Sequence, residues 1–294
     1  MAIPLVCFTT WNRAGLTARN LTALLQTTDD FELYIIDNNS QDDTWEFINQ
    51  LSDNRIKCKK RFDVNRGIIY ALNYVLSKRK KEQFFLYVEN DVCILSKDWI
   101  SRYLKIMNNF KDVGILGYVS PHVINAYSLK NYQMPKLISN KDTSYYQYHI
   151  VMGCLWCMRP ELIQYVGYWN EETYRGEIDM CMRINKYTSY KIGFDPTILI
   201  KHEKKINCED CILKNNCSLL DKSTTCFKLY KKKYMHNKFS KLMAYKISKY
   251  IEEIESKKRT VYCASIHDND SLKDHYYNKE WAMENFQFFI DNAN

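Results

Sequence analysis

The sequence predicts an α/β protein with a mainly parallel, doubly wound sheet, followed by a small, cysteine-rich and largely helical C-terminal region. Up to about residue 202, apolar runs of strand length alternate with segments whose apolar residues recur at helical spacing. This alternation is typical of parallel strands joined by helices. Beyond His202 the composition changes to lysine, cysteine and tyrosine. We therefore expect one domain at residues 1–203 and a separate region at residues 204–294.

The expected elements follow one another in a regular order. The strands are Ile3–Phe8, Leu33–Ile36, a segment from Ile56, Phe84–Val88, Val113–Val119, and short strands around residues 192–194 and 198–200. Ser40 with Asp43 resembles a capping box for the second helix, and Pro160 and Gly167 would open and close a later one. Residues 120–150 have no clear periodicity, so we expect a loop or lid there.

Bulk composition excludes several classes of protein. With 46% hydrophobic and 26% charged residues the chain of 294 residues is globular rather than disordered. No apolar run approaches the ~18 residues of a membrane-spanning helix. The N-terminus lacks the basic start and cleavage site of a signal peptide. We therefore expect a cytoplasmic protein, and peripheral contact with a membrane is compatible with this expectation.

Two acids follow the apolar strand Phe84–Val88. Glu89 and Asp91 stand two positions apart at its carboxyl end, where open α/β sheets bind ligands. Two buried carboxylates are costly unless a positive charge lies between them, such as a divalent cation that carries phosphates. Taken alone, the segment is equally compatible with a strand that is simply followed by a polar turn.

Several segments, in order and spacing, resemble the family-2 glycosyltransferases of GT-A fold over roughly residues 3–202. They are Thr10-Trp11-Asn12-Arg13, Ile36–Ser40, Asn65-Arg66-Gly67, Glu89-Asn90-Asp91, Gly153 with Arg159-Pro160 and Gly167, Gly176–Asp179 with Arg183, and His202. The resemblance implies a Rossmann-like sheet and an inverting enzyme. Such an enzyme moves a sugar from a nucleotide-sugar donor to an acceptor with the help of Mn²⁺ or Mg²⁺.

The resemblance also implies roles for single residues. Asp91 and His202 are expected to hold the cation, and Glu89 to reach a ribose or a metal-bound water. The other expected donor-binding residues are Thr10, Asn12, Arg13, Asp37, Asn39, Asn65 and Arg66. Glu177 matches the catalytic base, although most relatives have Asp there, and Asp179 matches the last acid of the same motif. Because residues i and i+2 of a helix point about 200° apart, only one can face the sugar, and we choose Glu177.

Four of the eleven cysteines lie in one short segment, as Cys208, Cys211, Cys217 and Cys226. Four thiolates at this spacing suit a tetrahedral structural Zn²⁺. An iron–sulfur cluster and four unlinked cysteines are the alternatives. The cluster is not part of the family's pattern, and we expect it to be separate from the catalytic chemistry.

From Lys222 to Lys249 the chain has nine lysines and no acid. Such a stretch suits an anionic membrane surface or nucleic acid, or it is an ordinary solvated face. The expected acceptor is a glycan, a lipid-linked intermediate or a protein. The alternatives are a modified base in DNA, which the lysines would favour, and a catalytically inactive module that binds a sugar nucleotide or nucleic acid.

Overall fold

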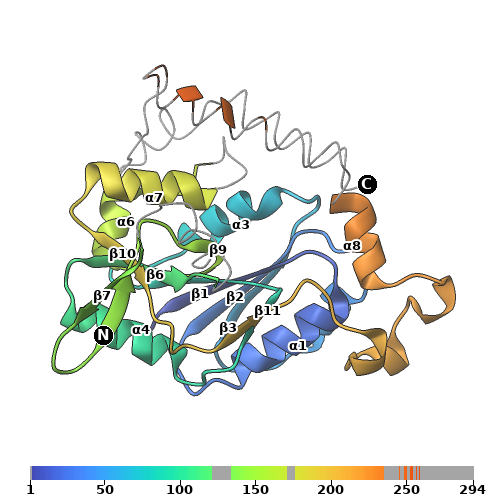
Figure 1. Ribbon diagram of the computed structural model, residues 1–294. Coiled ribbons are helices and arrows are strands. Elements are labelled where there is room, and N and C mark those ends of the chain that lie inside the picture. The colour runs from blue at the N-terminus through green and yellow to red at the C-terminus, as the bar shows by residue number, and fades with distance from the viewer. Residues whose placement is uncertain are drawn as a thin grey trace.

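The computed structural model describes residues 2–120, 134–170 and 176–234, with residues 245, 248, 249, 252, 253, 256 and 258. Within these residues a nine-stranded sheet has the order β3-β2-β1-β4-β9-β6-β10-β8-β7 (Figure 1). A second, two-stranded sheet pairs β11 with β5. The predicted α/β class is confirmed, and the larger sheet is parallel in its first half and mixed in its second.

The first half of the sheet is built from successive strand–helix units. Its elements are β1 (Leu5–Thr10), α1 (Ala14–Leu25), β2 (Glu32–Asp37), α2 (Thr44–Gln50), β3 (Ile56–Arg61), α3 (Gly67–Leu76) and β4 (Phe85–Glu89). All neighbouring strands here are parallel. The register pairs Thr10 with Asp37 and Thr9 with Glu89. The polar segments that follow these strands therefore meet at one edge of the sheet.

The second half contains antiparallel strands. Its elements are α4 (Trp99–Asn109), β6 (Val113–Tyr118), β7 (Lys136–Ser139), β8 (Ser144–Gln147), β9 (Met152–Met158), α6 (Pro160–Val166), α7 (Gly176–Tyr187) and β10 (Lys191–Phe194). Strand β9 lies between β4 and β6 and is antiparallel to both. Gly167 follows α6 with a φ of 67°, so the predicted end of that helix is confirmed.

The predicted loop over residues 120–150 is partly wrong. Its described part, residues 134–150, contains the hairpin of β7 and β8 at the edge of the sheet. Strand β7 is exposed on most of its length, so it needs no alternation of apolar and polar residues. The sequence signal for a half-buried strand is therefore missing. Residues 121–133 of the expected loop lie outside the described residues.

Helices cover both faces of the sheet (Figure 1). Alternate residues of β1 enter different apolar clusters, with Leu5 and Cys7 in one and Val6 and Phe8 in the other. Helices α3, α6 and α7 pack in the first cluster, and α1, α2 and α4 in the second. Burial on both faces explains why the central strands are apolar throughout rather than alternating.

The smaller sheet brings a distant segment back to the carboxyl end of β4. Strand β5 (Val92–Ile94) follows the two acids, and β11 (Ile200–His202) pairs with it in antiparallel register, with His202 opposite Val92. The backbone N–H of Glu203 donates to the carbonyl oxygen of Asp91 at 3.0 Å. His202 is thereby held beside Asp91.

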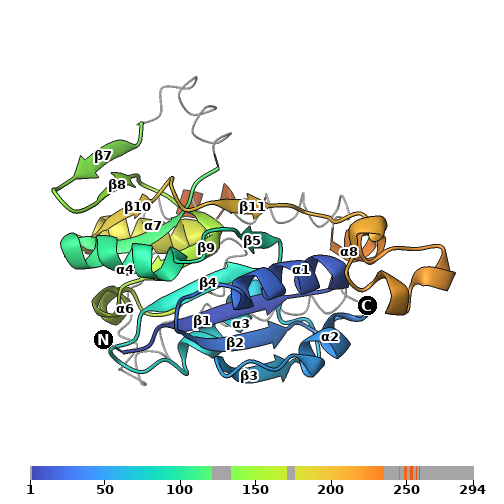
Figure 2. The same cartoon turned by 90° about the horizontal axis from the view of Figure 1, so that it is seen from below.

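The described C-terminal segment runs along the start of α1 (Figures 1 and 2). It consists of three short 3₁₀ helices, Cys208–Asp210, Lys214–Asn216 and Leu220–Lys222, and of α8 (Cys226–Tyr234). Within the lysine stretch from Lys222 to Lys249, residues 235–244, 246 and 247 lie outside the described residues. Of the helices that the structure describes, none is long and apolar enough to cross a bilayer.

Candidate active site

A cavity of about 270 Å³ opens where β1 and β4 end. Its walls come from segments far apart in the chain: the ends of β1 and β4, the start of α3, β9, α7, β11 and α8. The residues that the argument below uses are Thr10, Trp11, Arg13, Asn65, Tyr87, Glu89, Asp91, Glu177, His202 and Tyr230. The carboxyl edge of a parallel sheet is where such folds bind ligands, so this cavity is the candidate active site.

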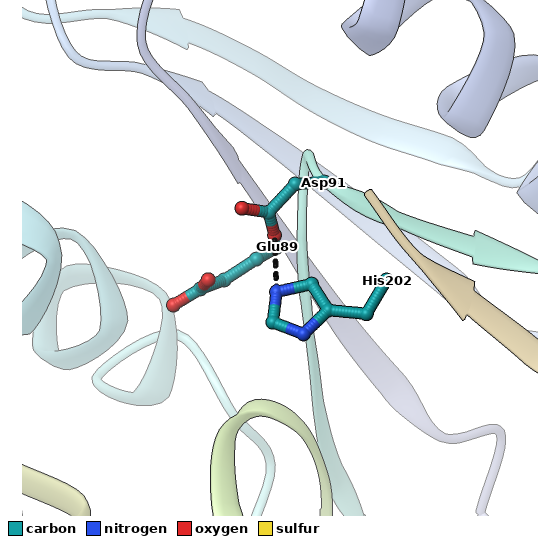
Figure 3. Close-up of side chains that lie close together, drawn as sticks. All are labelled: Glu89, Asp91 and His202. Atoms are coloured by element: carbon teal, nitrogen blue, oxygen red, sulfur yellow. Dashed lines mark ion pairs between the residues drawn. The ribbon is translucent and has the colours of Figure 1, made fainter. Parts of the chain in front are cut away.

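Three ligand groups converge in this cavity. Glu89, Asp91 and His202 each offer one atom, and these atoms lie within 4.8 Å of one another (Figure 3). Nε2 of His202 is 3.4 Å from Oδ1 of Asp91. The Asp91 side chain is 10% exposed, and its Oδ1 accepts no regular hydrogen bond from the described residues. Carboxylate oxygens with an imidazole nitrogen suit a divalent cation such as Mn²⁺ or Mg²⁺.

The two carboxyl groups have opposite pKa shifts. Burial, reinforced by the negative charge of Asp91, raises the pKa of Glu89 well above its ordinary value. Burial also acts to raise the pKa of Asp91, but His202 and the Arg13 guanidinium outweigh it, so this pKa is lowered. Without a cation Glu89 therefore holds its proton more tightly than Asp91 does. A bound divalent cation would favour the ionised form of both.

Arg13 supplies a positive charge next to Asp91. Its backbone is in the left-handed region, with φ 63°, and its Nη1 lies 3.2 Å from Oδ2 of Asp91. Its Nη2 donates to Oδ1 of Asn90 at 2.6 Å, while Nδ2 of Asn90 donates to Thr10 Oγ1 at 3.0 Å. Asn90, which stands between the two acids, therefore links the end of β4 to the loop after β1.

The other pair of acids, on α7, is divided between two environments. Glu177 lines the cavity. Asp179 is 1% exposed, and its Oδ2 accepts a hydrogen bond of 2.8 Å from Nε of Arg183. A Cβ atom added at Gly153 of β9 would lie 3.3 Å from Oε2 of Glu177, so a glycine there lets α7 approach the sheet closely.

The predicted donor-binding residues fall into two groups. Thr10, Arg13, Asn65 and Glu89 line the cavity. The others are not among its lining residues and make contacts within the surrounding loops, namely Asn12, Asp37, Asn39 and Arg66. Oδ1 of Asn12 accepts from the N–H of Gln41 at 2.7 Å, Nδ2 of Asn39 donates to the Asp63 carbonyl at 3.0 Å, and Arg66 pairs with the Asp63 carboxylate at 3.0 Å.

Asp37 holds the loop after β2. Its Oδ2 accepts from the N–H of Ser40 at 3.1 Å, and its Oδ1 is hydrogen-bonded to the Ser40 hydroxyl. Burial raises the pKa of Asp37 to about 6, although the Ser40 hydrogen bonds and Arg61 oppose the shift. The predicted capping box at Ser40 is wrong, because Ser40 binds Asp37 and α2 begins only at Thr44.

Several lining residues were not predicted from the sequence. The hydroxyl of Tyr87 donates to Oε1 of Glu89 at 2.8 Å, and the i, i+2 spacing of these two on one face of a strand was a usable signal. Tyr230 had no such signal. Its ring lies over the Arg13 guanidinium, and Cζ of Arg13 is 4.1 Å from the centroid of the Tyr230 ring, although the two residues are far apart in the chain.

The four clustered cysteines line a second cavity, of about 210 Å³, against the start of α1. Ala14, Gly15 and Asp42 contribute to the same cavity. Because α8 begins at Cys226 and carries Tyr230, this segment touches the active site. The four-cysteine segment therefore lies beside the candidate active site, and the expectation that the cysteines are separate from the catalytic chemistry stays a prediction.

Comparison with solved structures shows the same fold in several glycosyltransferases. The mannosyltransferase PcManGT of Pyrobaculum calidifontis, solved with GDP-Man and Mn²⁺, aligns with a TM-score of 0.54 and 17% identity over 68% of this chain and 57% of its own. GalNAc-T7, solved with UDP, GalNAc and Mn²⁺, gives a TM-score of 0.53 and 13% identity over 97% of this chain and 57% of its own.

A third structure is TarS residues 1–349 of S. aureus in complex with UDP. It gives a TM-score of 0.50 and 16% identity over 71% of this chain and 62% of its own. The alignments thus span less than two thirds of the length of these three proteins. Among curated protein sequences no relative of this chain was found.

The family model described as glycosyl transferase family 2 matches residues 5–167. This match covers more than half of the 294 residues and includes the loop after β1, the acids after β4 and Gly153 of β9. It agrees with the sheet order and with the fold shared with the solved glycosyltransferases. The chain belongs to glycosyl transferase family 2.

Proposed function

We propose that the chain is an inverting glycosyltransferase that uses a nucleotide-diphosphate sugar as donor and a divalent cation as cofactor. The observation that carries the proposal is one cavity in which a carboxylate–imidazole cluster faces a separate carboxylate. Glu89, Asp91 and His202 form the cluster, and Glu177 lines the same cavity. A transferase needs both parts, one for the leaving group and one for the acceptor.

The residues fit a divalent cation of the Mn²⁺ or Mg²⁺ kind. Asp91 and His202 would hold it, because their atoms lie 3.4 Å apart and Oδ1 of Asp91 accepts no regular hydrogen bond from the described residues. When bound, such a cation neutralises charge on a diphosphate leaving group. Arg13, adjacent to Asp91, would add a positive charge on the same side. Two solved structures of the same fold contain Mn²⁺ with a nucleotide or sugar nucleotide, which supports this assignment.

Glu177 is the proposed general base. It would accept the proton of the acceptor hydroxyl as that oxygen attacks the anomeric carbon, while the bond from that carbon to the diphosphate breaks. Direct displacement of this kind inverts the anomeric configuration. Asp179 is not proposed as a base, because it is buried in an ion pair with Arg183. Among the predicted donor-binding residues, Thr10, Arg13, Asn65 and Glu89 are the proposed contacts, because they line the cavity.

A panel of nucleotide sugars tests this proposal. The protein is incubated with Mn²⁺ and UDP- or GDP-linked sugars, and the released sugar is followed by NMR before its anomers equilibrate. We expect slow hydrolysis of at least one donor, with the first sugar formed as the anomer opposite to that of the donor. A first product of unchanged configuration would contradict the inverting mechanism, and no release from any donor would contradict the donor assignment. The acceptor classes given above, DNA included, stay predictions.

A further inference from the structure

The four-cysteine segment is packed against the first turn of α1. A Cβ atom added at Gly15 would clash with Sγ of Cys211, so this sulfur occupies the space that any other residue at position 15 would fill. The backbone N–H of Gly15 donates a hydrogen bond to the sulfur of Cys226. The N–H of Ser218 donates to Oδ2 of Asp43 at 2.8 Å, which anchors the middle of the segment beside α2.

The surroundings of these sulfurs act on the thiols in both directions. Burial raises the pKa of Cys226 to about 11 and raises the pKa of Cys217 above its ordinary value, while the backbone N–H groups of Gly15 and Leu219 oppose the shift. The first turn of a helix favours negative charge because its N–H groups are unpaired within the helix. Among the described residues, none of these four cysteines forms a disulfide. Short-spaced thiolates that line one cavity are the ligand set of a structural zinc site.

The donor set fits Zn²⁺ in kind and number. Zinc–sulfur bonds of about 2.3 Å in a tetrahedron place the sulfurs roughly 3.8 Å apart. In the described part of the chain, only the cluster of Glu89, Asp91 and His202 has three ligand atoms within 4.8 Å. The thiols therefore have to rotate toward a common centre when the ion binds. The cavity of about 210 Å³ that they line leaves room for this rotation.

The same segment forms part of the active-site wall. Helix α8 begins at Cys226, and Tyr230 follows one turn later on the same face. The ring of Tyr230 lies over the Arg13 guanidinium and meets Trp11 edge to face, with centroids 6.0 Å apart. Arg13 in turn contacts Asp91. A continuous line of contacts thus joins Cys226 to the cation-binding cluster.

We propose that the four cysteines bind one Zn²⁺, and that this ion fixes α8 so that Tyr230 closes the nucleotide-sugar cavity over Arg13. In this arrangement Tyr230 is a specificity and positioning residue contributed by a metal-held segment outside residues 5–167, which the family model matches. The part that concerns Tyr230 rests on the proposed function. The zinc site does not depend on it.

Metal analysis of the purified full-length chain tests the site itself. We expect one zinc ion per chain, lost in the double variant Cys208→Ser/Cys211→Ser. Cys58→Ser is the matched control, since Cys58 is a half-buried free cysteine on β3, and it should keep the metal. Absence of zinc from the wild-type protein, or an iron chromophore in its place, would overturn the zinc site.

Gly15→Ala provides a second, independent variant. Alanine is a better helix former than glycine, so this change in the first turn should not unfold α1. Its Cβ would occupy the space of Cys211 Sγ, and a sulfur fixed on a metal cannot swing away as a free thiol can. We expect a variant that is folded by circular dichroism and has weakened zinc retention against a competing chelator. Undiminished retention would contradict the placement of Cys211 in the site.

The proposed coupling between the zinc site and Tyr230 is tested by calorimetry, which measures the binding of UDP and GDP in the presence of Mn²⁺. Tyr230→Ala should weaken the preferred nucleotide roughly tenfold, the loss expected for one aromatic contact, while Tyr230→Phe should retain most of the affinity. The double cysteine variant should weaken binding by a similar factor. Adding Tyr230→Ala to it should then cost little more, because both changes remove the same contact.

These measurements separate the two proposals. Zinc that is bound and lost as expected, with nucleotide affinity unchanged in the double cysteine variant, would overturn the coupling and leave the zinc site standing. Fully additive losses would also overturn the coupling. A wild-type protein that retains zinc and binds neither nucleotide would overturn the proposed function and the role of Tyr230 together.

Discussion

The acids after β4 and the acids at the start of α7 have the same spacing in the chain and opposite arrangements in space. Glu89 and Asp91 point toward the same cluster with His202 (Figure 3). Glu177 faces the cavity, whereas Asp179 is turned into an ion pair with Arg183. Glu89 ends β4 and Asp91 follows in the turn to β5, which brings both side chains to one place, whereas residues i and i+2 on a helix diverge. One spacing therefore yields a shared ligand site in the first pair and a division of roles in the second.

The largest expected effect is in the strand pair. Asp91→Asn should reduce turnover to background, because the variant loses a charged ligand in a cluster that is proposed to hold the cation. The melting temperature without ligand should change little. Turnover is measured with the best donor of the panel in saturating Mn²⁺. Asp63→Asn is the control, since Asp63 is an exposed acid paired with Arg66 outside the cavity, and equal losses in the two variants would argue against the cluster.

The next effect concerns the acid of α7 that faces the cavity. Glu177→Gln keeps the shape of the side chain and removes the proton acceptor, so kcat should fall by roughly 10²–10⁴-fold. Donor affinity should stay within a factor of a few, because the cation cluster is untouched. Rapid-quench turnover and calorimetric donor binding on one preparation separate the two quantities. A normal kcat in Glu177→Gln would remove Glu177 from the mechanism.

The partner acid on α7 should affect stability rather than chemistry. Asp179→Asn removes the carboxylate that pairs with the buried Arg183 guanidinium, and breaking such a pair costs about 3–5 kcal/mol of unfolding free energy. The guanidinium keeps its hydrogen bonds to the carbonyls of Val166 and Tyr168, so the variant should still fold. Urea titration gives the free energy, and kcat per folded molecule should remain near the wild-type value. A stable variant that has lost kcat would assign the base to Asp179 instead.

The smallest effect comes from Asp37, a buried acid at the end of a neighbouring strand. Its pKa in the folded state is about 6, raised from its ordinary value of 3.8 chiefly by burial. A raised pKa means that the folded state binds the proton more tightly. The contribution of protonated Asp37 to the free energy of unfolding is therefore fully present below about pH 4 and is lost as pH rises through 6. Asp37→Asn cannot ionise, so its stability relative to wild type should increase from pH 4 to pH 7, by up to roughly 2–3 kcal/mol.

Urea titrations of both proteins across this pH range measure the Asp37 effect. Taking the difference between them cancels the titration of all other groups that the substitution leaves undisturbed. A relative stability that falls as pH rises would contradict the assigned pKa shift.

The first half of the fold and most of the cavity could be predicted because their signals are local. The strands β1, β2 and β4 are apolar on both faces, and the polar segments behind them carry Arg13, Asp37 and the two acids. Parallel strands of common direction bring those segments together without further information. His202 could be placed only through the family pattern, because the pairing of β11 with β5 leaves no trace in the composition of a three-residue strand.

Other features depend on contacts that no local pattern records. Ser40 has the residue type of a helix cap, yet its hydroxyl is bound to Asp37, a tertiary contact that outcompetes the local one. Strand β7 of the edge hairpin is mostly exposed and lacks alternation. Tyr230 resembles the other aromatic residues of a lysine-rich stretch, and only the packing of the four-cysteine segment on α1 turns it toward Arg13.

The central claim is that Asp91 and His202, with Glu89 beside them, hold the divalent cation that binds the donor diphosphate. Calorimetric titration of the wild-type protein with its best nucleotide-sugar donor, in Mn²⁺ and then in excess chelator, tests it most directly. The claim predicts measurable binding in Mn²⁺ and loss of most of the affinity in chelator, with restoration when Mn²⁺ or Mg²⁺ is returned. Equal donor affinity with and without the cation would contradict it.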